Sequence, residues 1–122
     1  MKPGNPVALL VDDDIQVCRA VRRLLSEWFR VRIAPSAAYA LAILEAEPVD
    51  LIVTEYDLGS NCGLELLAEA GRRVPAVRRV LVSPPLPKCM LAGIDLVVQK
   101  PFAPDLPQRL ARLLSPRDGV SV

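Results

Sequence analysis

Short apolar runs and amphipathic stretches alternate along this chain. Four apolar runs of strand length lie at Val7–Val11, Val49–Val53, Val80–Val82 and Leu96–Val98. A weaker fifth run lies at Val31–Ala34. As a group they lack a clean alternation of apolar and polar residues, which is typical of strands buried on both faces. The pattern therefore predicts a sheet that is covered on both sides.

Between these runs, apolar residues recur at spacings of three and four, as on one face of a helix. The predicted helical stripes are Val17, Val21, Leu24, Leu25 and Trp28; Tyr39, Leu41 and Leu44; Leu64, Leu66, Leu67 and Ala70; and Leu106, Leu110, Leu113 and Leu114. Ser36 is the predicted N-cap of the second helix. The third helix is expected to end near Gly71 and Pro75, and Pro104 or Pro107 to lie in the first turn of the last.

Strands that alternate with helices at this pace predict an α/β fold with a doubly wound parallel sheet. In such folds, ligands bind beyond the carboxyl ends of the strands. Asp12 and Asp13 follow the first predicted strand, and Glu55 follows the third. We therefore expect these carboxylates to lie at the same edge of the sheet.

One stretch breaks the alternation between the last two strands. It contains Pro84, Pro85 and Pro87. Proline lacks the backbone N–H that a helix interior needs and disfavours helical backbone in the residue before it. Only residues 88–92 remain, which is about one turn at 3.6 residues per turn. We expect the helix in this connection to be missing or reduced to a turn.

Composition narrows the possible functions. The 122 residues suit one domain, residues 1–122, and the net charge of +1 gives no bias toward nucleic acid or membrane. There is no histidine, which removes the usual general base and phosphohistidine chemistry. Cys18, Cys62 and Cys89 have no metal-ligand spacing and are interpreted as reduced thiols. We expect a cytoplasmic protein that contacts neither nucleic acid nor membrane directly.

Four short segments together carry a family resemblance. They are Val11-Asp12-Asp13-Asp14, the stretch from Asp50 through Thr54-Glu55 to Gly63, Val80-Leu81-Val82-Ser83, and Lys100-Pro101-Phe102. In this order they resemble the receiver domain of two-component response regulators, over nearly the whole chain. The resemblance implies a flavodoxin-like receiver fold with a five-stranded parallel sheet, whose fourth helix is the one that the prolines oppose.

The resemblance also implies a phosphoryl-transfer site. Asp12 and Asp13 match the acidic pair that holds Mg²⁺, with the backbone carbonyl of Asp57 as a further ligand. Ser83 matches the hydroxyl position and Lys100 the lysine that pairs with phosphate, and the Lys100-Pro101 bond is usually cis in the family. The acceptor position, eight residues before Gly63, is Glu55 instead of aspartate. Asp57 is the alternative acceptor, but its spacing to Gly63 is two residues too short.

Further departures bear on switching. The family's proline two residues after Asp57 is Gly59, the polar or acidic residue before Gly63 is Cys62, and the aromatic switch residue is Val97. We interpret the chain as an atypical receiver, not an enzyme. It would act as a protein-interaction module for a histidine kinase or other signalling protein, without normal phosphorylation and with at most weak Mg²⁺ binding.

Two alternatives stay open at this point. The first is a receiver that takes phosphate from a histidine kinase through Asp57 or Glu55. The second is a regulatory domain from a longer transcription factor or hybrid kinase. The oligomeric state is open, although we expect that the family-type dimer through the fourth-helix face does not form.

Overall fold

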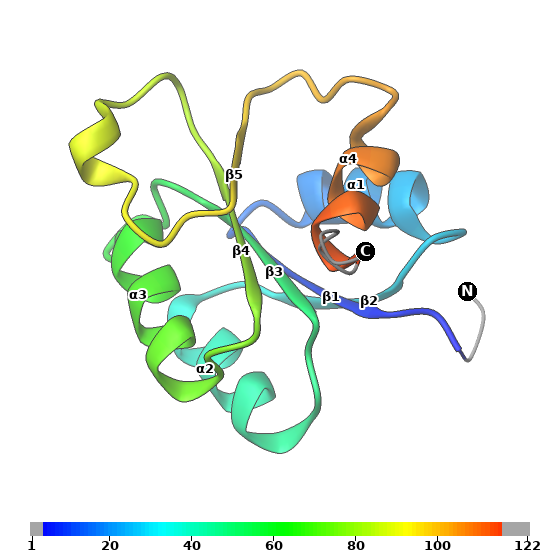
Figure 1. Ribbon diagram of the computed structural model, residues 1–122, viewed down its shortest axis with the longest axis horizontal. Coiled ribbons are helices and arrows are strands. Elements are labelled where there is room, and N and C mark those ends of the chain that lie inside the picture. Colours follow the sequence, from blue (N-terminus) through cyan, green and yellow to red (C-terminus); the bar gives the residue numbers. More distant parts are fainter. Residues whose placement is uncertain (1–3, 116–122) are drawn as a thin grey trace, which may run out of the picture.

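A five-stranded parallel sheet forms the centre of the computed structural model, which describes residues 4–115 (Figure 1). The strand order is β2-β1-β3-β4-β5. The strands are β1 (Val7–Val11), β2 (Arg30–Ala34), β3 (Leu51–Glu55), β4 (Arg78–Val82) and β5 (Leu96–Val98). This order places β3 at the centre and confirms the predicted α/β class with a doubly wound parallel sheet.

Helices cover both faces of this sheet. They are α1 (Ile15–Leu25), α2 (Ala37–Ala46), α3 (Gly63–Arg73) and α4 (Leu106–Leu114). Figure 1 shows α2 and α3 on one face and α1 and α4 on the other. Each face has its own buried apolar cluster, one centred on Leu9, Ile52 and Leu81 and the other on Leu10, Leu51 and Val80. Alternate residues of the same strands feed the two clusters, as strands buried on both faces require.

The connection from β4 to β5 has no α-helix. It contains only η1, a single 3₁₀ turn at Lys88–Met90, directly after Pro87. The prediction that the prolines remove the family's fourth helix is therefore confirmed. The helix labelled α4 is the last one within residues 4–115 and corresponds to the family's fifth.

Two aromatic residues assigned to the apolar stripes of helices are exposed. Trp28 is outside α1 and 41% exposed, because the chain turns back after Leu25, whose carbonyl accepts the N–H groups of Trp28 and Phe29. Phe29 fills the core instead and is fully buried. Tyr39 lies in α2 but is 55% exposed. The prediction that Trp28 and Tyr39 belong to buried faces was wrong.

Element boundaries shifted at several points. The third strand is Leu51–Glu55 instead of Val49–Val53, although the backbone N–H and C=O of Asp50 already bond to Val7 and Arg78 of the neighbouring strands. Helix α3 continues through Gly71 to Arg73. Ser36 caps α2 as predicted and accepts from the Tyr39 N–H. Pro107 lies in the first turn of α4, whereas Pro104 precedes it.

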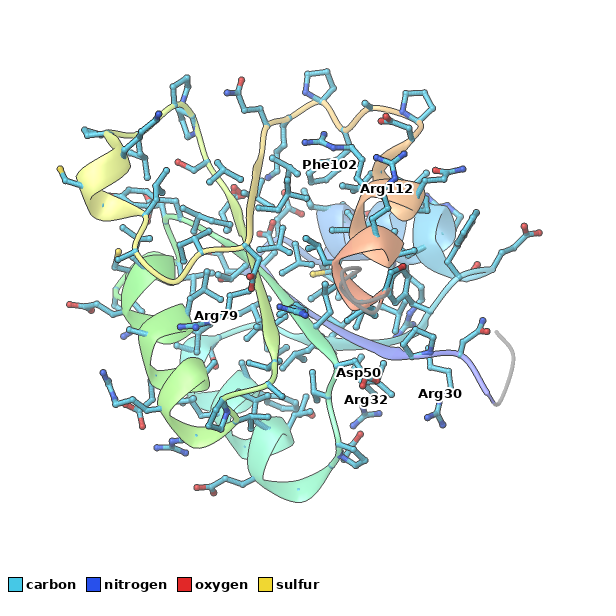
Figure 2. The ribbon with its side chains drawn as sticks, in the orientation of Figure 1. Arg30, Arg32, Asp50, Arg79, Phe102 and Arg112 are labelled. Carbon is cyan, nitrogen blue, oxygen red and sulfur yellow. The ribbon has the colours of Figure 1, made fainter. Side chains whose placement is uncertain are left out.

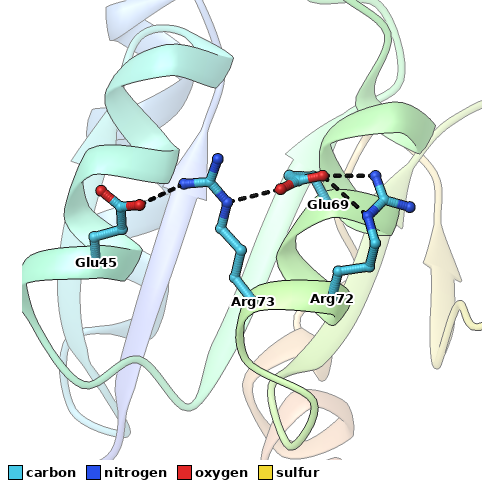
Figure 3. Close-up of polar contacts among 4 residues, drawn as sticks. All are labelled: Glu45, Glu69, Arg72 and Arg73. Atoms are coloured by element: carbon cyan, nitrogen blue, oxygen red, sulfur yellow. Dashed lines mark hydrogen bonds and ion pairs between the residues drawn. The ribbon is translucent and has the colours of Figure 1, made fainter.

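An exposed ion-pair network joins the two helices of one face (Figure 3). Arg73 of α3 contacts Glu45 of α2 at 2.9 Å and Glu69 of its own helix at 2.7 Å. Arg72 contacts the other oxygen of Glu69 at 2.6 Å. Exposed pairs of this kind contribute little stability, about 0.2–1 kcal/mol each.

Of the helices in residues 4–115, none is both long and apolar enough to cross a membrane.

Candidate functional site

The carboxyl ends of four strands bring most of the predicted site residues together. Asp12 follows β1, Glu55 ends β3, Ser83 follows β4 and Lys100 comes two residues after β5. One open pocket at this edge is lined by Glu55, Ser83 and Lys100, among others. The parallel sheet thus positions side chains that are far apart in the sequence at one site.

An ion pair occupies the centre of this site. Lys100 Nζ lies 2.8 Å from Glu55 Oε1 and 3.6 Å from Asp12 Oδ2. The Asp12 and Glu55 side chains are mostly shielded, at 12% and 20% exposed, whereas that of Lys100 is 41% exposed. Burial acts to lower the pKa of Lys100, but the contact with Glu55 and the charges of Glu55 and Asp12 outweigh it, so the pKa is raised. Lys100 is therefore held as the ammonium cation between two carboxylates.

The three aspartates that follow β1 have different surroundings. Asp12 Oδ1 accepts the Asp14 N–H at 2.9 Å, so only its other oxygen faces Lys100. Asp13 is exposed on the surface. Asp14 caps α1, where its carboxylate accepts the N–H groups of Gln16 and Val17. This cap was not predicted, although an aspartate directly before a helical stripe is an ordinary N-cap signature.

Asp57 lies in the loop after β3 with its side chain exposed. Its Oδ1 accepts the Gly59 N–H at 2.9 Å, which closes a tight turn. Gly59 has a φ of +79°, in the left-handed region that glycine tolerates best. The Asp57 carboxylate thus stabilises the loop itself and forms no ion pair with Lys100.

Gly63 begins α3 immediately beside the site. Its N–H donates to the Tyr56 carbonyl at 2.7 Å, and a β-carbon at this position would overlap the backbone carbonyl of Glu55. Glycine is therefore needed here for the close approach of helix and strand. This contact fixes the backbone of the acceptor position against the start of α3.

Ser83 is buried, with 2% of its surface exposed. Its hydroxyl donates to the carbonyl of Pro84 at 2.6 Å, and its backbone N–H donates to Val98 at 3.0 Å. The hydroxyl therefore lines the pocket but has its proton engaged by the proline segment. The Lys100–Pro101 bond is cis, as the resemblance implied. Val97, at the position of the family's aromatic switch, packs against the apolar cluster beneath α2 and α3.

Carboxylates and a backbone carbonyl at this site offer only some of the ligands that a metal ion needs. Within residues 4–115, no three acidic or cysteine side chains gather closely enough to hold a metal ion. Asp12, Asp13 and the Asp57 carbonyl offer the oxygen atoms that Mg²⁺ prefers. However, the Lys100 ammonium already contacts Asp12 and Glu55, so a cation would have to compete with it. Weak Mg²⁺ binding accordingly stays a prediction.

Comparisons with known proteins agree with this architecture. The profile of the family described as "Response regulator receiver domain" matches residues 8–111. The hydrogenase transcriptional regulatory protein HoxA of Cupriavidus necator is 32% identical over 86% of this chain and 23% of its own length. The alginate biosynthesis transcriptional regulatory protein AlgB of Pseudomonas aeruginosa is 34% identical over 80% of this chain and 23% of its own. The chain thus spans about a quarter of the length of these curated relatives.

Among solved structures, a CheY-like receiver domain from Methanospirillum hungatei superposes with a TM-score of 0.79. It is 25% identical, and the match covers 91% of this chain and 98% of that one. The fold, the order of the site residues and the profile match over residues 8–111 lead to one conclusion. This chain belongs to the receiver domain family of two-component response regulators.

Proposed function

We propose that this receiver domain acts in two-component signalling as a protein-interaction module that does not take up a phosphoryl group in the normal way. The observation that carries the proposal is the 2.8 Å ion pair between Lys100 and Glu55. In the family, the equivalent lysine pairs with the phosphate. Here a permanent carboxylate already occupies it, so the charge change that would report phosphorylation is absent.

The length of Glu55 supports the same proposal. Relative to aspartate, one extra methylene moves the carboxylate by about one ångström toward the space that a phosphoryl group would fill. A misplacement of this size in a group-transfer site can cost about a hundredfold in rate. Glu55 is thus poorly placed as a nucleophile, and the proposal assigns the domain no catalytic turnover.

The machinery that would transmit a signal has also changed. The Ser83 hydroxyl donates to Pro84, and the aliphatic Val97 has no aromatic ring to swing between buried and exposed positions. The fourth helix of the family is reduced to η1. These departures favour a domain that has lost switching over one that Glu55 holds permanently in an active-like state.

We further propose that partner proteins, such as a histidine kinase, contact a face other than the proline segment. The exposed arginines of α1, Arg19, Arg22 and Arg23, form a basic surface that fits an acidic partner. A dimer through the usual fourth-helix face lacks most of the helix that it would need. With a net charge of only +1, direct binding to nucleic acid has no electrostatic support.

One alternative gains support from the comparisons. HoxA and AlgB are named as transcriptional regulatory proteins, and this chain corresponds to 23% of each. A regulatory domain of a longer transcription factor is therefore our second candidate function. The other alternative, phosphorylation of Asp57, gains none, because its Oδ1 accepts the Gly59 N–H and the side chain lies in the exposed loop.

The test is intact-mass spectrometry after treatment with a small phosphodonor and Mg²⁺. The wild-type mass should stay unchanged, and Glu55→Asp should acquire one phosphoryl group, because Asp12, Ser83 and Lys100 are all present. Glu55→Asp combined with Lys100→Ala should label less. A stable gain of one phosphoryl group on the wild type would sink the proposal, and loss of that gain in Asp57→Asn would identify Asp57 as the acceptor.

A further inference from the structure

A second charged pocket lies at the opposite edge of the sheet from Glu55, where β1 and β2 begin. It is open to solvent and lined by Val7, Arg22, Arg30, Val31, Arg32 and Glu47. We infer that this pocket binds a small phosphate-bearing anion. The inference does not depend on the site around Glu55, because none of these residues contributes to it; only Arg22 is shared with the basic surface of α1 proposed above.

The pocket combines arginines from two layers of the fold. Arg22 comes from the last turn of α1, whereas Arg30 and Arg32 come from β2, the edge strand of the sheet. Helix α1 packs against β2, which brings Arg22 to the same pocket. Figure 2 shows Arg30 and Arg32 side by side at the outer end of the sheet, directed away from the core.

Local structure holds Arg30 in place while leaving its guanidinium end available. Its backbone N–H donates to the Pro6 carbonyl at 2.8 Å, and its Nε donates to the Asn5 carbonyl at 3.1 Å. Neither Arg30 nor Arg22 forms an ion pair with any residue between 4 and 115. A fixed Nε with free terminal nitrogens reduces the entropy that a ligand would have to overcome.

The pocket is positively charged in total. Its lining holds three arginines and one carboxylate, so its formal charge is 3 − 1 = +2. The carboxylate is Glu47, which pairs with Arg32 at 2.7 Å. Asp50 lies close by in Figure 2, and one of its oxygens accepts the Val7 N–H at 2.8 Å. Even with Asp50 included, the local charge is +1.

Ordinary structural roles explain each arginine only singly. A basic residue in the last turn of a helix complements its dipole, which accounts for Arg22. Charged side chains on an edge strand discourage pairing with another sheet, which accounts for Arg30 and Arg32. Neither role accounts for the three arginines lining one pocket at the edge of β2 together with Val7 and Val31.

The chemistry favours phosphate over carboxylate. A guanidinium group presents a planar set of N–H donors that bonds phosphate oxygens in pairs, and such charge-assisted bonds are short and strong. A phosphate group offers three oxygens and a charge of about −1.5 to −2 near neutral pH, against two oxygens and a single charge for a carboxylate. Three arginines around one pocket match the larger and more highly charged group.

Calorimetric titration of the full chain with pyrophosphate at low ionic strength tests the inference, with citrate as the carboxylate probe. We expect pyrophosphate to bind more tightly than citrate. Arg22→Gln with Arg30→Gln should weaken pyrophosphate binding by about tenfold or more. The charge-matched control, Arg109→Gln with Arg112→Gln on α4, should leave the affinity nearly unchanged. Glu47→Gln should tighten binding, because it removes the one negative charge of the lining.

Three results would overturn the inference. One is an absence of binding to wild-type protein that circular dichroism shows to be folded. Another is an equal loss of affinity in the two double variants, which would indicate diffuse attraction to a basic surface. The third is citrate binding as tightly as pyrophosphate, which would make the pocket a general or carboxylate site.

Discussion

Lys100 and Glu55 form an ion pair with 2.8 Å between Nζ and Oε1. The lysine lies two residues after β5, and the glutamate is the last residue of β3. The contact therefore passes over the end of β4, which lies between these two strands in the sheet. A second carboxylate, Asp12, lies 3.6 Å from the same ammonium. The lysine charge that the family uses to hold a phosphoryl group is thus already paired with carboxylates of the same domain.

This ion pair predicts a defined pH dependence of stability. The folded-state pKa of Lys100 is raised above its ordinary value of 10.5. Its contribution is therefore fully present below that value and is lost as pH rises through the folded pKa. Because the Lys100 side chain is 41% exposed, we expect Glu55→Gln to lower the free energy of unfolding by only about 0.5–1 kcal/mol at neutral pH. Urea unfolding should show the gap to wild type closing above the lysine pKa.

The control for this experiment is Glu27→Gln, which removes an exposed carboxylate outside the site. It should change stability little at any pH. A gap between wild type and Glu55→Gln that stays constant through the alkaline range would mean that Lys100 does not stabilise Glu55.

Competition between Lys100 and a divalent cation is the second prediction. A ligand that binds only the folded state raises stability by RT ln(1 + [L]/Kd). Wild-type protein should gain little from tens of millimolar Mg²⁺ in a thermal-unfolding series, because the ammonium already neutralises Asp12 and Glu55. Lys100→Ala should gain clearly more, with Na⁺ at equal ionic strength as the control. An equal Mg²⁺ response in both proteins would contradict this competition.

A third prediction concerns the contact of Gly63 with Glu55. In Gly63→Ala the added methyl would meet backbone atoms of Glu55 and Tyr56, which cannot rotate away. We expect a loss of about 1–3 kcal/mol in the free energy of unfolding, as for overpacked sites. Gly4→Ala is the matched control, since nothing lies within 4 Å of its β-carbon position. Urea unfolding of both variants should separate them, and equal stabilities would show that α3 can shift freely.

Thiol chemistry gives a fourth prediction. Burial and the nearby charges of Asp12 and Asp14 raise the pKa of Cys18 to about 11, and its Sγ lies 3.5 Å from the Asp12 carbonyl oxygen. Cys89 is exposed in η1. Iodoacetamide at mildly alkaline pH should therefore modify Cys89 rapidly and Cys18 only after unfolding, as peptide mass spectrometry would reveal. Equal modification of both thiols in the native protein would show that α1 opens readily.

Sequence alone predicted the features that depend on local rules. The apolar runs located the strands, Ser36 located a helix cap, and the prolines removed a helix, because each acts within a few residues. The same local rules placed Trp28 wrongly on the buried face of α1. Its spacing continues the stripe of α1, but the helix ends at Leu25 and the core takes up Phe29. Where a helix ends was decided by tertiary packing, which spacing does not record.

The same distinction between local rules and tertiary packing applies to the candidate site. Parallel topology alone predicted that Asp12 and Glu55 share an edge of the sheet. That the Ser83 hydroxyl donates to Pro84 depended on a side-chain conformation that no motif specifies. The Asp14 cap could have been predicted, but the acidic triplet was interpreted only as a candidate metal site.

The last prediction concerns the segment between Ser83 and Gly93. Its backbone hydrogen bonds are few, and two of them close the short turn at η1, from Met90 to Pro87 and from Leu91 to Lys88. Exchange of amide hydrogens is fast where backbone hydrogen bonds are sparse and solvent-exposed. We expect these amides to exchange faster than those of α3, and any dimer in solution to leave their rates unchanged. Slow exchange here, or protection that grows with protein concentration, would show that the segment is an ordered interface despite its prolines.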